Sequence, residues 1–381
     1  FQFFDENNNL ISSWLREETT EATNPKYKYE LNYKKQFENN EDHTLQLSAL
    51  GSFFGKELES QFANTTSSGT NINSDQQTKT NFQQADYTFK ADYVNPISEV
   101  YTIETGAQYV INDVGNDFEV RDFIDGAYLV NEDLTNNFEW NQKVLGFYAT
   151  GAYEKEKWGI KAGLRIEQTN VNTLLTNTNQ SNERNYSNFF PTLHTSYKIS
   201  DNVSFQAGYS KRIFRPRLWD LNPFFNIRNN FNIRVGNPNL QPEFTDSYEL
   251  TSIYKVGKAS LSSSLYHRHT TDVVARVSTF KDNVTFYTPE NIGTNSSIGF
   301  ETNGKYNTTT NGWSVSFTFR IQLYAKPAKT EDNNPSNKYS VEIRSSNPFI
   351  INTPAKEITK NSPCTHFSRS PNIKIAKMAV N

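Results

Sequence analysis

The stretch ADYTFKADYV, residues 85–94, carries the pattern on which the fold depends. Its apolar and aromatic side chains occupy every second position, and charged or polar side chains fill the positions between them. A period of two residues places the two sets on opposite faces of a β-strand. The stretch therefore predicts a strand with Tyr87 and Phe89 on an apolar face and Asp86 and Lys90 on a polar one.

The same alternation returns along the chain from Tyr27 to Phe319. We count about twelve such strands in this range and no convincing helix, because apolar residues recur every two positions rather than every three to four. The further in-phase sets are Tyr101, Ile103, Ala107, Tyr109 and Ile111; Leu145, Phe147, Ala149, Gly151 and Tyr153; Ile160, Ala162, Leu164 and Ile166; Val203, Phe205, Ala207 and Tyr209; Tyr248, Leu250 and Tyr254; Leu261 and Leu265; Ile298 and Phe300; and Trp313, Val315, Phe317 and Phe319.

The connections between these strands alternate in length. Tight turns are predicted at residues 38–42, 95–98, 154–158, 200–202 and 256–258. Long polar loops are predicted at residues 59–80, 112–137, 170–187, 212–244 and 270–283. This alternation is typical of an up-and-down barrel in an outer membrane, where periplasmic turns are short and extracellular loops are long.

A soluble antiparallel sandwich or barrel is the alternative, because its strands alternate as well. Three features favour the membrane barrel. The strands run about 10 residues or longer, whereas globular strands average roughly 5–6. The face opposite the apolar one is polar almost throughout, as a water-filled lumen allows. Aromatic residues stand near strand ends, where an aromatic girdle would lie; they are Tyr93, Tyr101, Tyr153, Trp158, Tyr209, Tyr254 and Trp313.

We therefore predict an all-β fold, an antiparallel up-and-down transmembrane β-barrel that is incomplete at about twelve strands. Its long loops would be extracellular, its short turns periplasmic, and its outer face in contact with the lipid of a Gram-negative outer membrane. No run of apolar residues approaches the roughly 18 residues of a transmembrane helix. The chain opens at Phe1 without the features of a signal sequence, so we expect either a processed protein or a fragment.

The composition is polar but rich in aromatic residues. Hydrophobic residues make up 35%, aromatic residues 14%, and the mean hydropathy is -0.72. Disordered chains are poor in aromatic residues, so the composition fits a β-structure in contact with water better than disorder. A net charge of -3, without a Lys or Arg run, argues against a nucleic-acid partner. A single cysteine, Cys364, excludes an internal disulfide framework.

The sequence changes character near Arg320. All 17 glycines lie before residue 321, whereas the only cysteine and the only methionine lie after it. We divide the chain into a partial barrel at residues 1–320 and a non-barrel tail at residues 321–381. The tail is either a natural basic, disordered extension or sequence outside the native reading frame. The strand that ends at Phe319 has no evident hairpin partner, and a membrane sheet cannot leave an edge bare in lipid, which favours the second interpretation.

The segment RIFRPRLWDLNPFFNIRNNFNIRVGNPNLQPEF, residues 212–244, has neither helical nor strand periodicity. Together with its flanks it contains an Arg-Pro pair, a Leu-Asn-Pro-Phe run, a Gly-Asn-Pro-Asn-Leu-x-Pro-Glu run and a strand opened by Ser-Tyr-Glu-Leu. This ordered pattern resembles the outer-membrane β-barrel family close to TonB-dependent receptors, and FFPTLHTSYKIS, residues 189–200, resembles the preceding strand of that family. The matching positions are Arg215, Pro216, Leu221, Asn222, Pro223, Phe224, Gly236, Asn237, Pro238, Asn239, Leu240, Pro242 and Glu243.

The resemblance implies a receptor that takes up a bulky nutrient across the outer membrane. It also implies two partners, a plug domain in the lumen and an inner-membrane energy-coupling complex. Members of the family usually carry a signal peptide, a small β-domain and a plug, none of which is visible here. A transporter barrel of this type has about 22 strands. The chain is therefore expected to be an internal piece of the barrel.

Two roles are open for the segment at residues 212–244. Its prolines forbid regular pairing, and Gly236 with Asn237 suits a turn. In a structural role, Trp219, Leu221, Phe224 and Phe225 would cap the barrel mouth, and the arginines would bind carbonyls and acids such as Asp220 and Glu243. In a ligand-binding role, the arginines would attract an anion. The candidate residues for either role are Arg212, Arg215, Arg217, Trp219, Arg228 and Arg234.

The sequence gives little evidence for a metal site or a catalytic site. His267, His269 and Asp272 could bind a metal, but a lumen-facing or loop pair is the simpler interpretation. Asp5, Asn7 and Asn9 mimic the start of a calcium loop whose later positions do not fit. No nucleophile elbow or phosphate-binding loop is present. We therefore predict no catalytic residue, no metal and no cofactor, and hence no enzyme.

The leading hypothesis is the barrel portion of a nutrient receptor of TonB-dependent type. The alternative is a structural or adhesive barrel without a plug, which displays its surface loops.

Overall fold

The structure, a computed structural model, describes residues 2–37, 40–68, 75–223, 232–281, 284–307, 314–325, 339–344 and 350–352. Six residues named above lie outside this part of the chain: Phe1, Phe224, Phe225, Arg228, Trp313 and Cys364.

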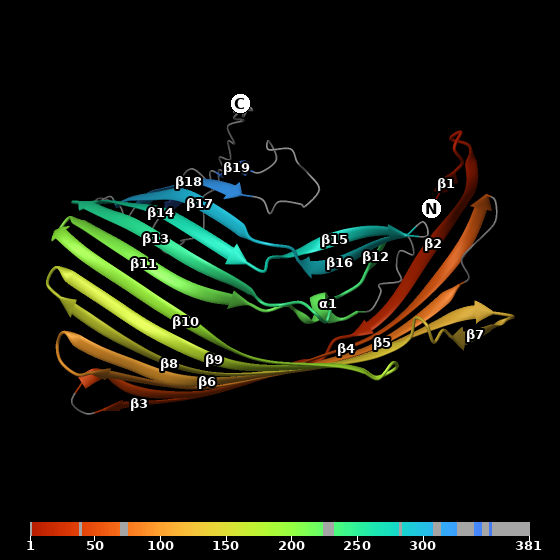
Figure 1. Ribbon diagram of the computed structural model, residues 1–381, viewed down its shortest axis with the longest axis horizontal. Coiled ribbons are helices and arrows are strands. Elements are labelled where there is room, and N and C mark those ends of the chain that lie inside the picture. Colours follow the sequence, from red (N-terminus) through yellow and green to blue (C-terminus); the bar gives the residue numbers. More distant parts are fainter. Residues whose placement is uncertain are drawn as a thin grey trace, which may run out of the picture.

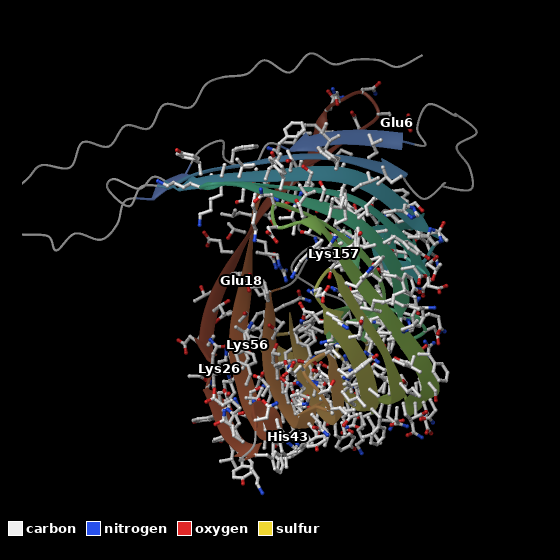
Figure 2. The ribbon with its side chains drawn as sticks, turned by 90° about the vertical axis from the view of Figure 1, so that its left-hand side faces the viewer. Glu6, Glu18, Lys26, His43, Lys56 and Lys157 are labelled. Atoms are coloured by element: carbon white, nitrogen blue, oxygen red, sulfur yellow. The ribbon has the colours of Figure 1, made fainter. Side chains whose placement is uncertain are left out.

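One large antiparallel sheet contains most of the strands, and it curves around an interior (Figures 1 and 2). Its strands are β1 (Gln2–Phe4), β2 (Leu10–Thr23), β3 (Lys26–Phe37), β4 (Asn40–Ser68), β5 (Gln76–Pro96), β6 (Tyr101–Ile124), β7 (Ala127–Val130), β8 (Asn136–Lys155), β9 (Trp158–Leu175), β10 (Gln180–Ser200), β11 (Val203–Phe214), β13 (Glu243–Val256), β14 (Ala259–Thr271), β17 (Asn295–Asn307), β18 (Ser314–Ala325), β19 (Tyr339–Arg344) and β20 (Ile350–Asn352).

Three short strands and one helical turn complete the described fold. The strands β12 (Asn232–Arg234), β15 (Val274–Lys281) and β16 (Val284–Asn291) form a second sheet, in which β12 pairs with β16 in parallel. The helical turn is α1 (Leu218–Leu221). Figure 1 shows α1, β12, β15 and β16 on the concave side of the large sheet. The expectation of no helix therefore needs one correction, a single turn between strands.

The long strands pair in the order in which they follow along the chain. From β3 to β18 each long strand of the large sheet pairs with the next, antiparallel throughout. Twelve long strands lie between Lys26 and Ala325 in the described residues, so the predicted number for this range and the up-and-down topology are confirmed.

The first long strand is interrupted at Pro25. Strand β2 pairs with residues 57–68 of β4, and β3 pairs with residues 40–54 of the same strand. Between them, the Gly55 N–H donates to the Pro25 carbonyl oxygen over 2.9 Å. Proline has no N–H for a strand ladder, so the ladder breaks where Pro25 stands and resumes on either side. Strands β2 and β3 therefore extend the barrel pattern upstream of Tyr27, where the alternation was first recognised.

The two faces of the large sheet differ as the alternation predicts. Large apolar side chains on the outer face are exposed, for example Phe147 at 56% and Leu193 at 44%. A soluble protein rarely exposes so extended an apolar band, whereas lipid covers such a band on a membrane barrel. Further members of this band are Tyr29, Leu31, Leu47, Tyr87, Phe89, Ile103, Leu145, Ile160, Leu164, Phe189, Phe205, Leu250, Leu265, Ile298 and Phe300.

Aromatic pairs on this outer face lie close to the tight turns, where a girdle is expected. The rings of Tyr101 and Tyr153 are 5.1 Å apart, and those of Trp158 and Tyr197 are 4.5 Å apart. The opposite face is polar: the Lys161 ammonium group donates to the Glu104 carboxylate over 2.8 Å, and Arg165 donates to Gln108 over 2.9 Å.

Four of the five predicted tight turns are confirmed, and they gather at one end of the sheet (Figure 1). The turn predicted at residues 38–42 includes residues 38 and 39, which lie outside the described part of the chain. Strand β8 ends at Lys155 and β9 begins at Trp158, and Glu156 between them has a φ of 43°. Strand β13 ends at Val256 and β14 begins at Ala259, with Gly257 at a φ of 55°. Glycine has no Cβ to clash in this left-handed region, which suits it to the turn.

Four of the predicted long loops are mostly strand, and those boundaries are wrong. Strands β4 and β5 continue to Ser68 and from Gln76, β9 ends only at Leu175, and the loop after β14 contains the hairpin of β15 and β16. Likewise β6 runs to Ile124, β7 lies within the remainder of residues 112–137, and β8 begins at Asn136. Beyond the bilayer both faces of a strand meet water, so the polar-apolar alternation that reveals a strand disappears.

The expectation that no strand follows the one ending at Phe319 is also wrong. Strand β18 continues to Ala325, and its partners β19 and β20 both lie after residue 320. The division into a barrel at residues 1–320 and a separate tail stays a prediction. Within the described residues no pairing joins β1, β2 or β3 to β17, β18, β19 or β20, so the sheet is not closed.

Candidate functional site

We call the segment between β11 and β13, residues 215–242, the lumen segment, and its described residues lie on the concave side of the large sheet. The flanking strands meet at its base, where Phe214 pairs with Glu243. The chain therefore leaves the wall and returns to it at one point. Of the lumen segment, the structure describes residues 215–223 and 232–242.

Helix α1 is a single turn because its sequence permits no more. The Leu221 N–H donates to the Arg217 carbonyl oxygen over 3.2 Å, and the Asn222 N–H to that of Leu218 over 2.8 Å. The Asp220 carboxylate accepts from the Arg217 N–H over 3.3 Å, as a capping side chain does. Pro223 follows at once and has no N–H to continue the ladder. The turn directs Leu218 and Leu221 to one side, where both are buried.

The two runs of the motif, which are far apart in the sequence, lie against each other. The Gly236 N–H donates to the Asn222 carbonyl oxygen over 2.9 Å, and the Asn237 N–H to that of Asp220 over 2.7 Å. A Cβ atom on residue 236 would lie 2.2 Å from the Asn222 carbonyl oxygen, so only glycine fits without a shift of the backbone. The Asn237 side chain then turns the chain, because its oxygen accepts from the Asn239 N–H over 2.9 Å.

An apolar cluster fastens the lumen segment to the wall. Leu218, Leu221 and Leu240 are buried among side chains of the lumen face. Burial of each leucine contributes on the order of 1.5–3 kcal/mol. The wall residues of this cluster are Phe82, Val114, Phe138, Trp140 and Leu175.

Arg215 forms the strongest polar link between the lumen segment and the wall. Its Nη2 atom lies 2.6 Å from Glu167 Oε2 and 3.0 Å from Thr169 Oγ1, both on β9. Arg165 binds the other oxygen of Glu167 over 2.5 Å. The side chains of Arg215 and Glu167 are only 18% and 9% exposed, so this pair is largely shielded from water. The partner differs from the acids expected from sequence, since Asp220 and Glu243 accept backbone N–H groups instead.

The second motif run is fastened to β10. The Arg184 guanidinium donates to the Leu240 carbonyl oxygen over 2.5 Å. The Asn182 amide donates to the carbonyl oxygen of Pro238 over 3.3 Å and to the side chain of Asn239 over 3.2 Å. Prolines and turns leave these carbonyl oxygens without strand partners, and the wall supplies the donors that a buried carbonyl needs.

The hairpin of β15 and β16 covers the other side of the lumen segment. The Val235 N–H donates to the Tyr287 carbonyl oxygen over 3.0 Å, and the Asn237 amide to that of Pro289 over 3.1 Å. The Gln241 N–H donates to Asn291 Oδ1 over 2.8 Å. The lumen segment is therefore held between the wall and this hairpin.

The remaining candidate side chains face outward from this packed core. The Trp219 indole stacks on Phe82 with 5.6 Å between ring centroids, yet 67% of the residue is exposed. The Arg217 guanidinium carbon lies 5.6 Å from the centre of the Phe214 ring. Arg234, on β12, is exposed and borders a cavity.

This cavity lies between the lumen segment and the wall, and we call it the mouth cavity. Its volume is about 440 Å³. It is bordered by residues of β2, β4, β5, β6, the lumen segment and the hairpin of β15 and β16. Its principal side chains are Glu18, Phe54, Lys56, Phe62, Phe82, Phe118, Trp219, Asp220, Arg234, Arg276 and Tyr287. Figure 2 shows that Glu18 and Lys56 belong to the same wall of the sheet.

Arg16 lies near this wall on β2, in the part of the sheet beyond the bilayer. Its guanidinium carbon is 4.3 Å from the centre of the Phe62 ring, and its Nη2 atom donates to Gln76 over 2.6 Å. Burial lowers the pKa of Arg16, although Glu18 and other acids oppose the shift. The guanidinium stays protonated at neutral pH because its ordinary pKa is so high.

The histidines and the asparagine-rich turn have structural surroundings. Register places Tyr266 and Arg268 on the inner face of β14 and hence His267 and His269 on the outer face, so the lumen-facing interpretation is wrong. His267 stacks on Tyr248 with 6.1 Å between centroids. Asp5 closes the turn between β1 and β2 by accepting from the Asn7 and Asn9 N–H groups. Among the described residues, no cluster of His, Cys, Asp and Glu could hold a metal ion.

Sequence reasoning missed the wall partners of the lumen segment. Alternation alone indicates that Phe82, Glu167 and Arg184 share the lumen face of their strands. It does not indicate which of the many lumen-facing residues the segment reaches. No helix in the described part of the chain is long and apolar enough to cross a bilayer.

Comparison with known proteins adds the following. The model of a family described as outer membrane protein beta-barrel family matches residues 6–360. Curated proteins give no match.

Several solved structures are similar to this chain at low sequence identity. The copper transporter OprC has a TM-score of 0.51 at 12% identity, with 85% of this chain and 58% of OprC covered. The RagAB peptide transporter has a TM-score of 0.51 at 15% identity, covering 80% of this chain and 37% of that one. For the ferric citrate transporter FecA the TM-score is 0.45 at 13% identity, covering 80% and 43%. The chain thus spans about two fifths to three fifths of the length of these proteins.

Proposed function

The chain belongs to the outer membrane protein beta-barrel family, and from this premise we propose that it forms part of the barrel of a receptor of TonB-dependent type. Such a receptor takes up a bulky nutrient across the Gram-negative outer membrane. The observation that carries the proposal is the lumen segment. It fills part of the interior and leaves a cavity beside it.

The position of the mouth cavity supports a role in capture from outside the cell. Phe54, its first wall residue on β4, stands 14 residues after Asn40, where that strand leaves its tight turn. A strand crosses the bilayer in about 9–11 residues. The cavity therefore lies on the side of the membrane opposite the tight turns, and in barrels of this class that side is extracellular.

The partners follow from the same proposal. A plug domain would contact the polar lumen face, where Lys161 pairs with Glu104 and Arg165 pairs with Gln108. An inner-membrane energy-coupling complex would then act on the plug. The solved structures that share the fold are transporters, which supports a role in transport rather than in catalysis.

Cells that lack the gene provide the test. Wild-type and deletion cells are grown in the same defined medium, and depletion of each nutrient is followed by mass spectrometry. We expect one class of solute to be depleted only by wild-type cells, and depletion to stop when the proton-motive force is collapsed. Complementation by Arg215→Ala should restore little uptake, whereas the exposed Lys79→Gln should restore it fully.

Two results would contradict the proposal. Depletion that is identical in both strains would show that the protein takes up nothing from the medium. Loss of cell adhesion in the deletion strain, with unchanged uptake, would instead favour the structural or adhesive barrel.

A further inference from the structure

The mouth cavity joins an aromatic wall to a set of cations, a combination that the packing of the lumen segment does not require. The rings of Phe54 and Phe82 are 5.9 Å apart, and the Trp219 indole continues the stack on the far side of Phe82. Packing uses one face of this indole. The residue is nevertheless 67% exposed, so a large aromatic surface borders the cavity.

Three cations border the same space: Lys56 on β4, Arg234 on β12 and Arg276 on β15. Among the described residues, none of them forms an ion pair with a carboxylate. Arg234 and Arg276 are exposed. Since the walls have a low dielectric constant, three cations in one recess raise the local concentration of anions.

The acids of the mouth cavity are engaged by their own neighbours. Asp220 accepts from the Arg217 N–H, and Glu18 accepts from the hydroxyl groups of Thr20 and Ser60 over 3.1 and 3.2 Å. These donors are uncharged, so both carboxylates keep their charge, and the cavity lining has three cations against two acids. This balance favours an anionic ligand over a cationic one.

We propose that the mouth cavity binds a small organic anion that carries a flat aromatic group. The aromatic ring would stack on the exposed face of Trp219, a contact whose geometry indole favours. The carboxylate or other anionic group would bind Arg234 and Arg276, whose planar guanidinium groups suit two-point hydrogen bonds. A volume of about 440 Å³ suits a compact molecule rather than a polymer. This inference rests on the proposed function, since it names the class of solute that the receptor captures first.

The test is binding of 2-naphthoate to the purified protein in detergent, measured by isothermal titration calorimetry. The neutral 2-naphthamide has the same ring without the charge, and cyclohexanecarboxylate has the charge without the ring. We expect 2-naphthoate to bind at least about tenfold more tightly than either, because charge-assisted hydrogen bonds and stacking each contribute on that order.

Variants assign the two contacts. Arg234→Gln and Arg276→Gln should each weaken 2-naphthoate binding by about tenfold and leave 2-naphthamide unchanged. Trp219→Ala should weaken both aromatic probes. Arg121→Gln and Trp158→Ala are the matched controls, because Arg121 pairs with Glu119 away from the cavity and Trp158 stands at a tight turn. A heat-dependent shift in gel mobility establishes that each variant is folded.

Three results would overturn the inference: no binding of 2-naphthoate, equal affinities for 2-naphthoate and 2-naphthamide, or equal losses in the variants and their controls. Tight binding of 2-naphthoate without any nutrient uptake in cells would leave the inference standing and count against the proposed transport. Uptake in cells without binding of 2-naphthoate would overturn the inference and leave the proposed transport standing.

Discussion

At Gly236 an added methyl group would lie 2.2 Å from the carbonyl oxygen and 2.8 Å from the nitrogen of Asn222, both backbone atoms. Backbone atoms cannot rotate away as a flexible side chain can, so the two motif runs would have to separate. The motif therefore needs glycine at this position because two backbones are in contact there. It needs arginine at position 215 for its charge, because Arg215 joins the lumen segment to a carboxylate on the wall that is largely shielded from water.

Gly236→Ala should loosen the lumen segment while the barrel wall persists. Overpacking of this kind costs about 1–3 kcal/mol, and the segment should become sensitive to added protease. Limited proteolysis followed by mass spectrometry would detect cuts between residues 215 and 242. Gly151→Ala is the control, because a Cβ there meets nothing within 4 Å. Equal protease resistance of both variants would show that the contact with Asn222 is not needed.

The pair of Arg215 and Glu167 should show a large coupling energy in a double-mutant cycle. We expect about 1–3 kcal/mol for Arg215→Met combined with Glu167→Gln, measured by guanidinium unfolding in detergent. The exposed pair of Lys79 and Glu59, 2.9 Å apart, should give less than about 1 kcal/mol because water screens it. Equal coupling in the two cycles would mean that burial does not strengthen the pair.

The long strands have one part in which apolar and polar residues alternate and another part in which they do not. On β8, Leu145 and Phe147 face outward in the half near the tight turn, whereas Phe138 and Trp140 in the far half face inward and are buried against the lumen segment. The near half meets lipid on one face and the lumen on the other. The far half meets the lumen segment and water. The two halves of this strand therefore lie in different environments, and their large apolar residues face opposite sides of the sheet.

Phe147→Arg should destabilise the barrel through contact with lipid. A lipid-facing arginine near the bilayer midplane costs about 2–4 kcal/mol, and the cost falls toward the interfaces. Gln206→Arg is the matched control, because residue 206 faces the lumen, where water solvates the charge. Unfolding by guanidinium in phospholipid vesicles would measure both. If Gln206→Arg lowered the free energy of unfolding more than Phe147→Arg, the lipid face and the lumen face of the sheet would be assigned the wrong way round.

For the whole molecule, the two ends of the sheet are expected to lie on opposite sides of the outer membrane. The four described tight turns gather at one end, and the long hairpins extend toward the other (Figure 1). The mouth cavity is lined by the halves of β4, β5 and β6 that lie away from these turns. Barrels of this class keep short turns in the periplasm, because their assembly leaves the longer loops outside.

An epitope inserted after Glu132, beyond β7, should bind antibody on intact cells. The same epitope inserted after Glu156, in the turn between β8 and β9, should bind antibody only after the outer membrane has been permeabilised. Flow cytometry on both strains distinguishes the two positions. Staining of the Glu156 insertion on intact cells would reverse the orientation and place the mouth cavity in the periplasm.

Much of the fold could be predicted because alternation is a local signal. Tyr87, Phe89 and their counterparts identify a strand and its two faces without any knowledge of the neighbours. The predicted loops were too long, as at residues 170–187, because Thr173 and Asn182 lie at strand ends where apolar and polar residues no longer alternate regularly. The lumen-facing assignment of His267 failed for a related reason, since two polar residues on an outer face do not reveal which face they occupy.

The antiparallel barrel wall, the tight turns, the membrane environment and the motif residues of the lumen segment follow from the amino-acid sequence alone. They depend on a period of two, on turn residues and on an ordered pattern of glycine and proline, all of which are local signals. The contacts of Arg215 with Glu167, of Gly236 with Asn222 and of Trp219 with Phe82 are known only from the folded structure. Each of these contacts joins positions far apart in the chain, and it depends on how the wall curves and where the segment returns to it.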